Sequence, residues 1–296
     1  MKLIKQSFEF IDQTDFSLVG AKKHIERCAR VSYKSEDKIT DTSYEKFVNM
    51  LESRGHDRPL EFGTIHLKMD EETLTVLQND LIDEGIYNDY WLKWDEEREN
   101  GNYYVFLTTN YRYYLEICKY CPWIKDSLDE SDSEYYPKRY TIHMILDRGV
   151  MDEFRTHVGL SHLAESTRYC NYSKDKFGNE LTFIQPCWLN DEKLKLYGPY
   201  HTVIRDKSPE SIFIANLNNV ERDYLDLIKL GWTSQQARSI LPLGIKSELI
   251  SCGFEDAWEN FMRRRSPKYG DPGAHPMAAE IADKLCEEFI KRGYKL

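Results

Sequence analysis

The sequence predicts an α+β fold in which a central, mainly antiparallel sheet is flanked by helices. β-Branched and aromatic runs lie toward the middle of the chain and favour strands. Apolar residues at helical spacing fill the C-terminal third and favour helices. Because no repeat or low-complexity linker interrupts the 296 residues, we expect one elaborated domain over residues 1–296.

The N-terminal part of the chain favours one strand and two helices. Residues 2–10 predict an opening strand, and residues 18–31 form a helical pattern with one buried face. Thr42 or Ser43 is expected to cap the next helix. That helix ends at Gly55, a residue suited to a left-handed helix exit.

Three strands are expected to pair in the sheet. Residues 62–69 alternate as a strand does, and residues 103–109 and 139–146 are rich in β-branched and aromatic side chains. We expect the second and third of these runs to pair with the first. The charge-rich segment 70–102 is predicted to be a helical insertion at the surface.

The remaining chain is predicted to be mostly helical. A turn at 147–149 opens a helix whose pattern runs from Val150 to Ser161, and 171–178 is a loop. A short strand is expected at 182–184, and 186–209 lacks any period. The last predicted elements are helical: 212–230, a short helix after the capping box Thr233–Gln236, 256–265 and 274–292.

Composition limits the classes of partner. The 40 Lys and Arg against 50 Asp and Glu give a net charge of −10, which does not favour binding to nucleic acid or to a membrane surface. A small anion held by a local basic cluster is compatible with this charge. No apolar run is long enough to span a membrane and no signal peptide is recognisable, so we expect a cytoplasmic protein.

The cysteines are expected to be free thiols. Their number, seven, is odd and they are scattered, which does not indicate a disulfide framework. The single CxxC pair, Cys118 and Cys121, has no second pair and no histidine at metal-ligand spacing. We therefore expect no metal site.

Two segments concentrate side chains that suit anion binding. Residues 155–168 carry arginine, histidine and hydroxyl side chains, and the donors at 166–168 suit a phosphate or a carbonyl-rich ring. Arg263, Arg264 and Arg265 follow Arg238 and form a second positive cluster. The alternative for the first segment is a solvated helix face followed by an N-cap. The alternative for the second is a set of surface charges on one helix, of which only one in three faces a given pocket.

Motifs for other chemistries are absent from the sequence. It contains no GxSxG elbow, no GxGxxG motif and no Walker loop. Ser161 and Ser166 lie near His157 and His162, but no third member of a triad is recognisable. His66 and His143 fall in strand patterns, where we expect ordinary strand residues.

The stretch Glu165–Glu180, which contains Ser166 and Arg168 and follows Ser161, resembles the flavin-dependent thymidylate synthase family, in a branch found in bacteria and their phages. That family's signature is RHRxxSxxxxSxR, and this chain ends it with Ser161, Ser166 and Arg168. Further matches run nearly end to end: Arg30–Lys38, Gly55–His56 with Glu61, Thr108–Asn110, Asp147–Val150, Gln236–Pro242, Ala274–Pro276 and Glu288–Tyr294.

The resemblance implies a fold and an activity. The fold would be that of flavin-dependent thymidylate synthases, and the activity the reductive methylation of dUMP to dTMP. The implied cofactor is FAD, with NADPH and methylenetetrahydrofolate as co-substrates. The implied assembly is a homotetramer whose active sites lie between subunits. No enzyme cysteine attacks the ring in this chemistry.

The resemblance also implies roles for individual residues. Arg265 would be catalytic, polarising the uracil ring near N3. The implied dUMP contacts are Glu153, Ala164, Glu165, Ser166, Thr167, Arg168, Arg238 and Arg265. The implied FAD contacts are His56, Arg58, Glu61, Arg155, Thr156, His157, Val158, Phe254 and Asn260.

The chain departs from the signature where the family has its two RHR arginines. Thr156 and Val158 occupy those positions, His157 is kept, and Arg155 is displaced by one residue. On a helix this displacement rotates a side chain by about 100°. Two alternatives to thymidylate synthesis follow. One is another C5 modification of a pyrimidine nucleotide, such as hydroxymethylation, and the other is a non-catalytic nucleotide-binding homologue.

Overall fold

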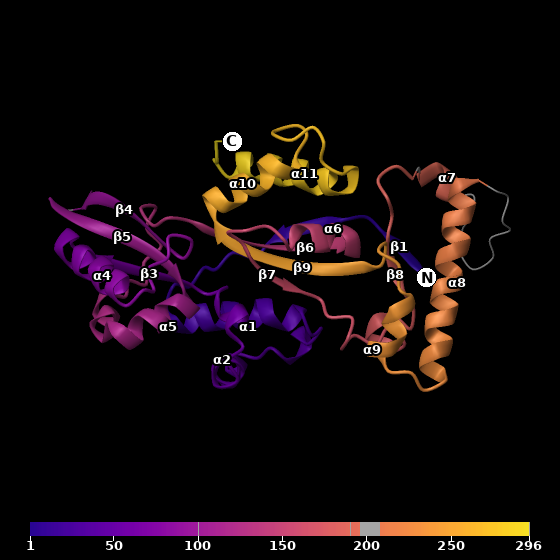
Figure 1. Cartoon of the computed structure of the whole chain (residues 1–296), viewed down its shortest axis with the longest axis horizontal. Helices are drawn as coiled ribbons and strands as arrows, with labels where there is room; N and C mark the ends of the chain where they lie inside the picture. The colour runs from indigo at the N-terminus through magenta and orange to yellow at the C-terminus, as the bar shows by residue number, and fades with distance from the viewer. Residues whose placement is uncertain (100, 190, 196–207, 296) are drawn as a thin grey trace.

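The strands of the described residues form three β-sheets that follow one another along an elongated molecule (Figure 1). The computed structural model describes residues 1–99, 101–189, 191–195 and 208–295. A four-stranded sheet in the order β2-β6-β9-β7 occupies the middle, a three-stranded sheet β3-β5-β4 lies at one end, and a two-stranded sheet β1-β8 lies at the other. The α+β class with antiparallel sheets is confirmed, and the strands form three sheets.

The central sheet is antiparallel throughout. It consists of β2 (Ser7–Phe10), β6 (Arg139–Asp147), β9 (Lys246–Phe254) and β7 (Ser161–Ala164). Strand β9 has no counterpart among the sequence predictions, although all its residues after Lys246 are buried. Its serine and glutamate residues conceal the strand pattern, because they are buried with polar partners from distant segments.

Helices cover both faces of the central sheet (Figure 1). On one side, α10 (Glu255–Arg265) and α11 (Pro276–Lys291) pack Trp258 and Phe289 against Met144 and Leu146. On the other side, α1 (Leu18–Val31) packs Cys28 and Val31 with Ile250 and Cys252. Consecutive side chains of a strand point to opposite faces, so two separate cores share one sheet.

The helix predicted from Val150 to Ser161 is wrong in its second half. Helix α6 (Arg148–Phe154) ends before the turn at 155–160, and Ser161 begins β7. The hydroxyl of Thr156 donates to the Glu153 carbonyl at 2.7 Å, and Gly159 has φ +94°, a backbone conformation that L side chains rarely adopt. The helical rotation of about 100° therefore does not apply at Arg155, which is already the C-cap of α6.

The three-stranded sheet contains β3 (Thr64–Met69), β5 (Asn102–Asn110) and β4 (Leu92–Glu99). The predicted pairing of β3 with β5 is confirmed, whereas β6 pairs with β2 and β9 instead of β3. Segment 70–102 provides α4 (Glu71–Asp83) and the strand β4. Leu74, Leu77 and Leu81 of α4 lie in the hydrophobic core of this end of the molecule.

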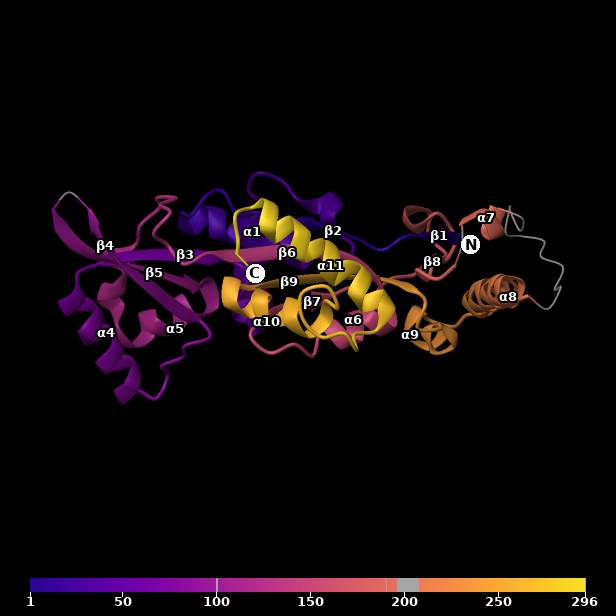
Figure 2. The same ribbon diagram turned by 90° about the horizontal axis from the view of Figure 1, so that it is seen from above.

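The two-stranded sheet pairs β1 (Lys2–Ile4) with β8 (Thr182–Ile184) in parallel. The predicted opening strand is therefore divided into β1 and β2 at Lys5 and Gln6. The long helix α8 (Pro209–Lys229) and the short α9 (Ser234–Ala237) stand at this end (Figure 2). The capping box is confirmed, with the Thr233 amide donating to Gln236 Oε1 at 2.9 Å.

The remaining elements are the two longer helices α2 and α5 and several short helices and turns. Most of them lie in connections between the sheets. They are α2 (Ser43–Ser53), α3 (Asp57–Leu60), α5 (Tyr111–Tyr120), α7 (Asp191–Lys195) and the 3-10 turns Glu36–Lys38, Pro122–Ser127, Asp175–Phe177 and Arg238–Ile240. Of the predicted irregular segment 186–209, residues 190 and 196–207 lie outside the described residues. None of the described helices combines the length and apolar character that a membrane span requires.

Candidate functional site

Most of the predicted site residues are divided between two hollows of the central body. We name them the Ser166 hollow and the Arg265 hollow. The Ser166 hollow, about 410 Å³, is lined by Ser32, Tyr33, Arg148, Arg155, His162, Leu163, Ala164, Glu165, Ser166, Thr167, Tyr169 and Arg238. The Arg265 hollow, about 390 Å³, is lined by Glu153, Thr156, His157, Val158, Asn260, Arg264, Arg265 and Asp271.

A buried ion-pair network fixes the loop that follows β7. Glu165 is only 1% exposed, and its carboxylate accepts hydrogen bonds from Lys246 Nζ at 2.8 Å and from the Tyr172 hydroxyl at 3.2 Å. Lys246 also pairs with Glu248, which in turn contacts Lys34 and His143. Burial of Lys246 alone would lower its pKa, but the two carboxylates outweigh this effect and raise it. Glu165 therefore carries no uncompensated charge.

Cationic and hydroxyl groups face the Ser166 hollow from several elements. Arg238 Nη1 lies 3.4 Å from Thr167 Oγ1, and the amide of Ser166 donates to the Ser32 carbonyl at 3.2 Å. Ser32 Oγ is buried without a hydrogen-bond partner among the described residues. Arg168 is exposed and donates to Gln235 Oε1 at 3.0 Å. The hollow is thus rich in donors for an anion.

Two lining arginines belong to α6. Arg148 starts this helix and Arg155 is its C-cap. The roles inferred from the resemblance do not include Arg148, although Asp147–Val150 is one of the matching segments. Arg155, which the resemblance places among the flavin contacts, lines the Ser166 hollow instead of the Arg265 hollow.

Arg265 is buried but makes few hydrogen bonds. Its side chain is about one-tenth exposed, and its planar head lies near the rings of Phe154 and Phe261. Nη2 donates to the Glu153 carbonyl at 3.3 Å, Nε is 3.7 Å from the Glu153 carboxylate, and Nε is buried without a hydrogen-bond partner among the described residues. A guanidinium has five N–H donors, so most of its capacity is unused.

The other side chains of the Arg265 hollow balance its charge. Arg264 and Arg265 face Glu153 and Asp271. His157 is neutral, because burial and the nearby Arg265 lower its pKa to about 4, and its Nε2–H donates to the Ala257 carbonyl at 3.2 Å. Asn260 Oδ1 accepts from Arg264 Nε at 2.8 Å. Val158 stands at the rim with 74% of its surface exposed.

Four predicted flavin contacts line neither hollow. His56 and Arg58 are exposed on α3 and at its start. Glu61 is buried and accepts from Ser161 Oγ at 2.5 Å and Arg112 Nη1 at 2.6 Å. Phe254 ends β9 in a buried position. Glu61 is therefore engaged within the fold and Phe254 is buried in it. His56 and Arg58 are exposed, and Arg58 Nε lies 3.9 Å from the Glu61 carboxylate.

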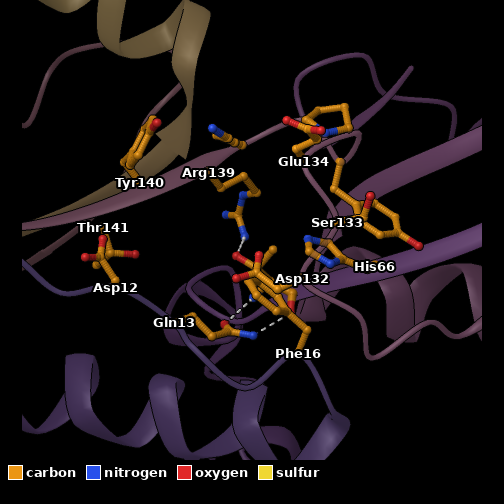
Figure 3. Close-up of a pocket in the computed structure, with 14 residues that line it drawn as sticks. Asp12, Gln13, Phe16, His66, Asp132, Ser133, Glu134, Arg139, Tyr140 and Thr141 are labelled. Carbon is orange, nitrogen blue, oxygen red and sulfur yellow. Dashed lines mark hydrogen bonds between the residues drawn. The ribbon is translucent and has the colours of Figure 1, made fainter. Parts of the chain in front are cut away.

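A third hollow, about 310 Å³, lies between the central and three-stranded sheets and contains none of the predicted site residues. Arg139 extends between Tyr140 on one side and His66 on the other (Figure 3). The head of Arg139 donates to the carbonyls of Glu61 and Gly63, and His66 stacks between Phe16 and Tyr136 with centroid distances of 4.1 and 3.9 Å. The guanidinium of Arg139 thus bonds to backbone carbonyls where the two sheets meet, and the ring of His66 is packed between two aromatic rings there.

The seven cysteines are free thiols, as predicted. Burial raises the pKa of Cys170 to about 12 and the pKa of Cys121 and Cys286 to about 11. Cys187 is exposed as a residue, but partial burial of its thiol raises its pKa as well. None of these four thiols is activated as a nucleophile.

Comparison with known proteins gives one family and several distant structures. A search of curated protein sequences finds no match. The UMP/dUMP methylase PolB from Streptomyces cacaoi bound with 5-Br dUMP is 14% identical, with 98% of this chain and 93% of that chain covered and a TM-score of 0.41. Thymidylate synthase X from Helicobacter pylori with FAD and dUMP is 17% identical, with 50% and 66% covered and a TM-score of 0.35.

The family match covers the part of the chain that builds most of both hollows. It extends from residue 137 to residue 292 and so includes β6, β7, β9, α6 and α10. This is more than half of the 296 residues. The chain therefore belongs to the family described as thymidylate synthase complementing protein.

Proposed function

We propose that this protein methylates dUMP at C5 to give dTMP, taking the methylene group from methylenetetrahydrofolate and reducing equivalents from NADPH through FAD. Three things support the proposal: membership of the family, the cationic Ser166 hollow and the buried Arg265. The observation that carries it is the guanidinium of Arg265, which is buried at a hollow while most of its donors are unused.

The Ser166 hollow is suited to the phosphate of dUMP. Glu165, the one carboxylate among the described residues that line it, is already paired with Lys246, so Arg238 and the neighbouring Arg168 present uncompensated positive charge. Guanidinium groups bind phosphate oxygens in bidentate geometry, and hydroxyl groups add donors. Ser166 and Thr167 supply these hydroxyls at the loop that Glu165 anchors.

The Arg265 hollow is suited to the uracil ring. Its arginines and carboxylates balance, so it has no excess charge for a phosphate. A ring carbonyl that gains negative charge during the reaction would be stabilised by the preorganised donors of Arg265. Burial lowers the pKa of Arg265, but an arginine remains protonated at neutral pH. Its role is thus electrostatic.

A site shared between subunits would bring the two hollows together. Within one chain, Arg265 and Arg238 line different hollows, although one nucleotide must meet both. A symmetric homo-oligomer, which we propose to be a tetramer, can place the Arg265 hollow of one subunit beside the Ser166 hollow of another. Tyr33 and Tyr169 stand exposed on the Ser166 hollow with ring centroids 5.6 Å apart and are available for such a contact.

Exposed side chains fit FAD around these hollows. The exposed residues that would hold it are His56 at the start of α3, Arg58 on α3, and Thr156, Val158 and Asn260 at the Arg265 hollow. Glu61 would act by anchoring the start of β7 through Ser161. When bound, FAD supplies the hydride that reduces the transferred carbon. The raised pKa values of Cys170, Cys187 and the buried thiols agree with chemistry that needs no cysteine nucleophile.

The test combines flavin content with turnover. We expect the purified protein to show flavin absorbance, or to gain it with excess FAD. It should release tritium from C5-labelled dUMP with folate and NADPH under reduced oxygen, and the product should be dTMP. A protein that takes up no flavin and releases no tritium contradicts the proposal, and a hydroxymethyl product would replace methylation by the related C5 modification.

A further inference from the structure

One face of α6 carries a charged triad that the proposed dUMP site does not use, and the two arginines of this triad line the Ser166 hollow. Arg148, Asp152 and Arg155 are spaced i, i+4 and i+7, which places them on the same side of the helix. Arg148 and Arg155 both line the hollow. The helical rise separates the start points of these two side chains by about 10 Å, with Asp152 between them.

Asp152 holds both arginines without satisfying them. Its Oδ2 lies 3.5 Å from Arg148 Nε, and its Oδ1 lies 3.6 Å from Arg155 Nη2. Both distances exceed the usual length of a charge-assisted hydrogen bond, about 2.7–2.9 Å. Asp152 Oδ1 is buried without a hydrogen-bond partner among the described residues. The carboxylate thus orients two guanidiniums whose donors stay largely free.

The rest of the hollow does not neutralise this pair. Arg148 Nη1 makes one further contact, 3.4 Å to the Glu165 carbonyl, and the Glu165 carboxylate is paired with Lys246. His162 lies nearby but is neutral: burial, with the charges of Arg58 and Arg155, lowers its pKa to about 4. A monophosphate bound by Arg238 and Arg168 would leave one net positive charge on the triad.

We propose that Arg148 and Arg155 form a second oxyanion subsite in the Ser166 hollow, distinct from the position where Arg238 and Thr167 bind the first phosphate. This inference rests on the proposed nucleotide site. The second oxyanion has two chemical sources: a further phosphate on the nucleotide itself, or a carboxylate of the folate co-substrate. A phosphate is tetrahedral and a carboxylate is planar, and a guanidinium binds two oxygens of either group in bidentate fashion.

The experiment measures affinity ratios in the full-length protein by calorimetry. The first arm compares dUDP with dUMP. The second arm compares tetrahydrofolate carrying three glutamates with tetrahydrofolate carrying one, in the presence of saturating dUMP. We expect wild-type protein to prefer the more anionic member of one pair at least tenfold. The double variant Arg148→Gln, Arg155→Gln should reduce that ratio to near one.

Two control variants separate the subsite from general charge. Arg238→Gln should weaken dUMP and dUDP alike and leave their ratio unchanged. Arg263→Gln removes an exposed arginine that is bonded to Glu259 outside the hollow, and it should change neither ratio. Circular dichroism establishes that each variant is folded before binding is measured.

The outcomes are distinct for the two proposals. Wild-type protein that binds no dUMP contradicts the proposed function. If dUMP binds but neither ratio exceeds one, or if the double variant leaves both ratios at their wild-type values, the subsite is wrong. An equal loss of dUMP and dUDP affinity in the double variant also overturns it, because the arginines would then belong to the first phosphate position.

Discussion

The two hollows of the central body both contain arginines, but they differ in how their acidic side chains are neutralised. In the Ser166 hollow Glu165, the one carboxylate among the described lining residues, is buried and paired with Lys246. Asp152 offsets one of the two charges of Arg148 and Arg155, so with Arg238 the hollow keeps an excess of positive charge. In the Arg265 hollow two carboxylates face two arginines. The difference indicates an anion site in the first and a site for a neutral ring, which gains charge during reaction, in the second.

The largest effect is expected where the Ser166 hollow is anchored. Replacing Lys246 by Met leaves Glu165 and Glu248 buried without their shared cation, which costs about 3–5 kcal/mol of unfolding free energy. Chemical denaturation measures this loss. The control Lys268→Met removes an exposed pair with Glu287 and should cost less than about 1 kcal/mol. Equal losses in the two variants would show that the network does not support the loop.

Elements differ in how far the sequence alone predicts them, according to whether their pattern is local or depends on distant partners. Residues 18–31 and the β3–β5 pairing are predictable, because periodic apolar residues specify both elements locally. Strand β9 is not, because Ser251 and Glu248 acquire their partners His162 and His143 only when distant segments meet. A local pattern contains no record of such partners.

The sequence predicts which residues belong to the site but not how they are arranged in space. Motif resemblance identifies Ser166, Arg238 and Arg265, but their division between two hollows depends on the end of α6 at Phe154. The helical spacing of Val150 and later residues conceals that end, which is followed by a turn in which Gly159 has φ +94°. Arg148 became a site residue only through this arrangement.

Turnover should depend most on the Arg265 hollow. We expect Arg265→Gln to lower kcat by about a hundred- to a thousandfold, or about 2.7–4 kcal/mol, because the variant loses preorganised charge at the ring. Its dUMP dissociation constant should change far less. Single-turnover kinetics and calorimetry measure the two quantities. Parallel losses in both would assign Arg265 to ground-state binding.

Nucleotide affinity should depend most on the Ser166 hollow. Arg238→Gln removes a charged donor close to Thr167, and we expect dUMP affinity to fall by about 1.5–3 kcal/mol, or about ten- to a hundredfold. Arg263→Gln, on the exposed side of α10, serves as the matched control. If both variants bind dUMP equally well, the phosphate lies elsewhere.

The smallest effect is a shared sensitivity to acid. His157 and His162, one in each hollow, have pKa values of about 4 against an ordinary value of 6.5. On acidification the unfolded chain therefore binds protons at these histidines before the folded protein does. The stability that the neutral histidines contribute is fully present above pH 6.5 and is lost as pH falls toward 4. At pH 5.5 each histidine should cost about 1 kcal/mol relative to pH 7.5.

Denaturation at these two pH values, in wild type and in His162→Gln, isolates one of the two contributions. The variant should lose less stability than wild type on acidification, by about 1 kcal/mol. If His162→Gln loses as much unfolding free energy as wild type between the two pH values, His162 is not held neutral by the fold.

Mixing two inactive variants tests the central claim, a pyrimidine site assembled from the Arg265 hollow of one subunit and the Ser166 hollow of another. At a dUMP concentration that saturates wild type but lies well below the dissociation constant of Arg238→Gln, Arg265→Gln and Arg238→Gln are each expected to release little tritium from labelled dUMP. After they are unfolded and refolded together, about a quarter of the sites in a symmetric oligomer should contain both arginines. We predict recovery of activity in that proportion. An active wild type with no recovery in the mixture would contradict the account.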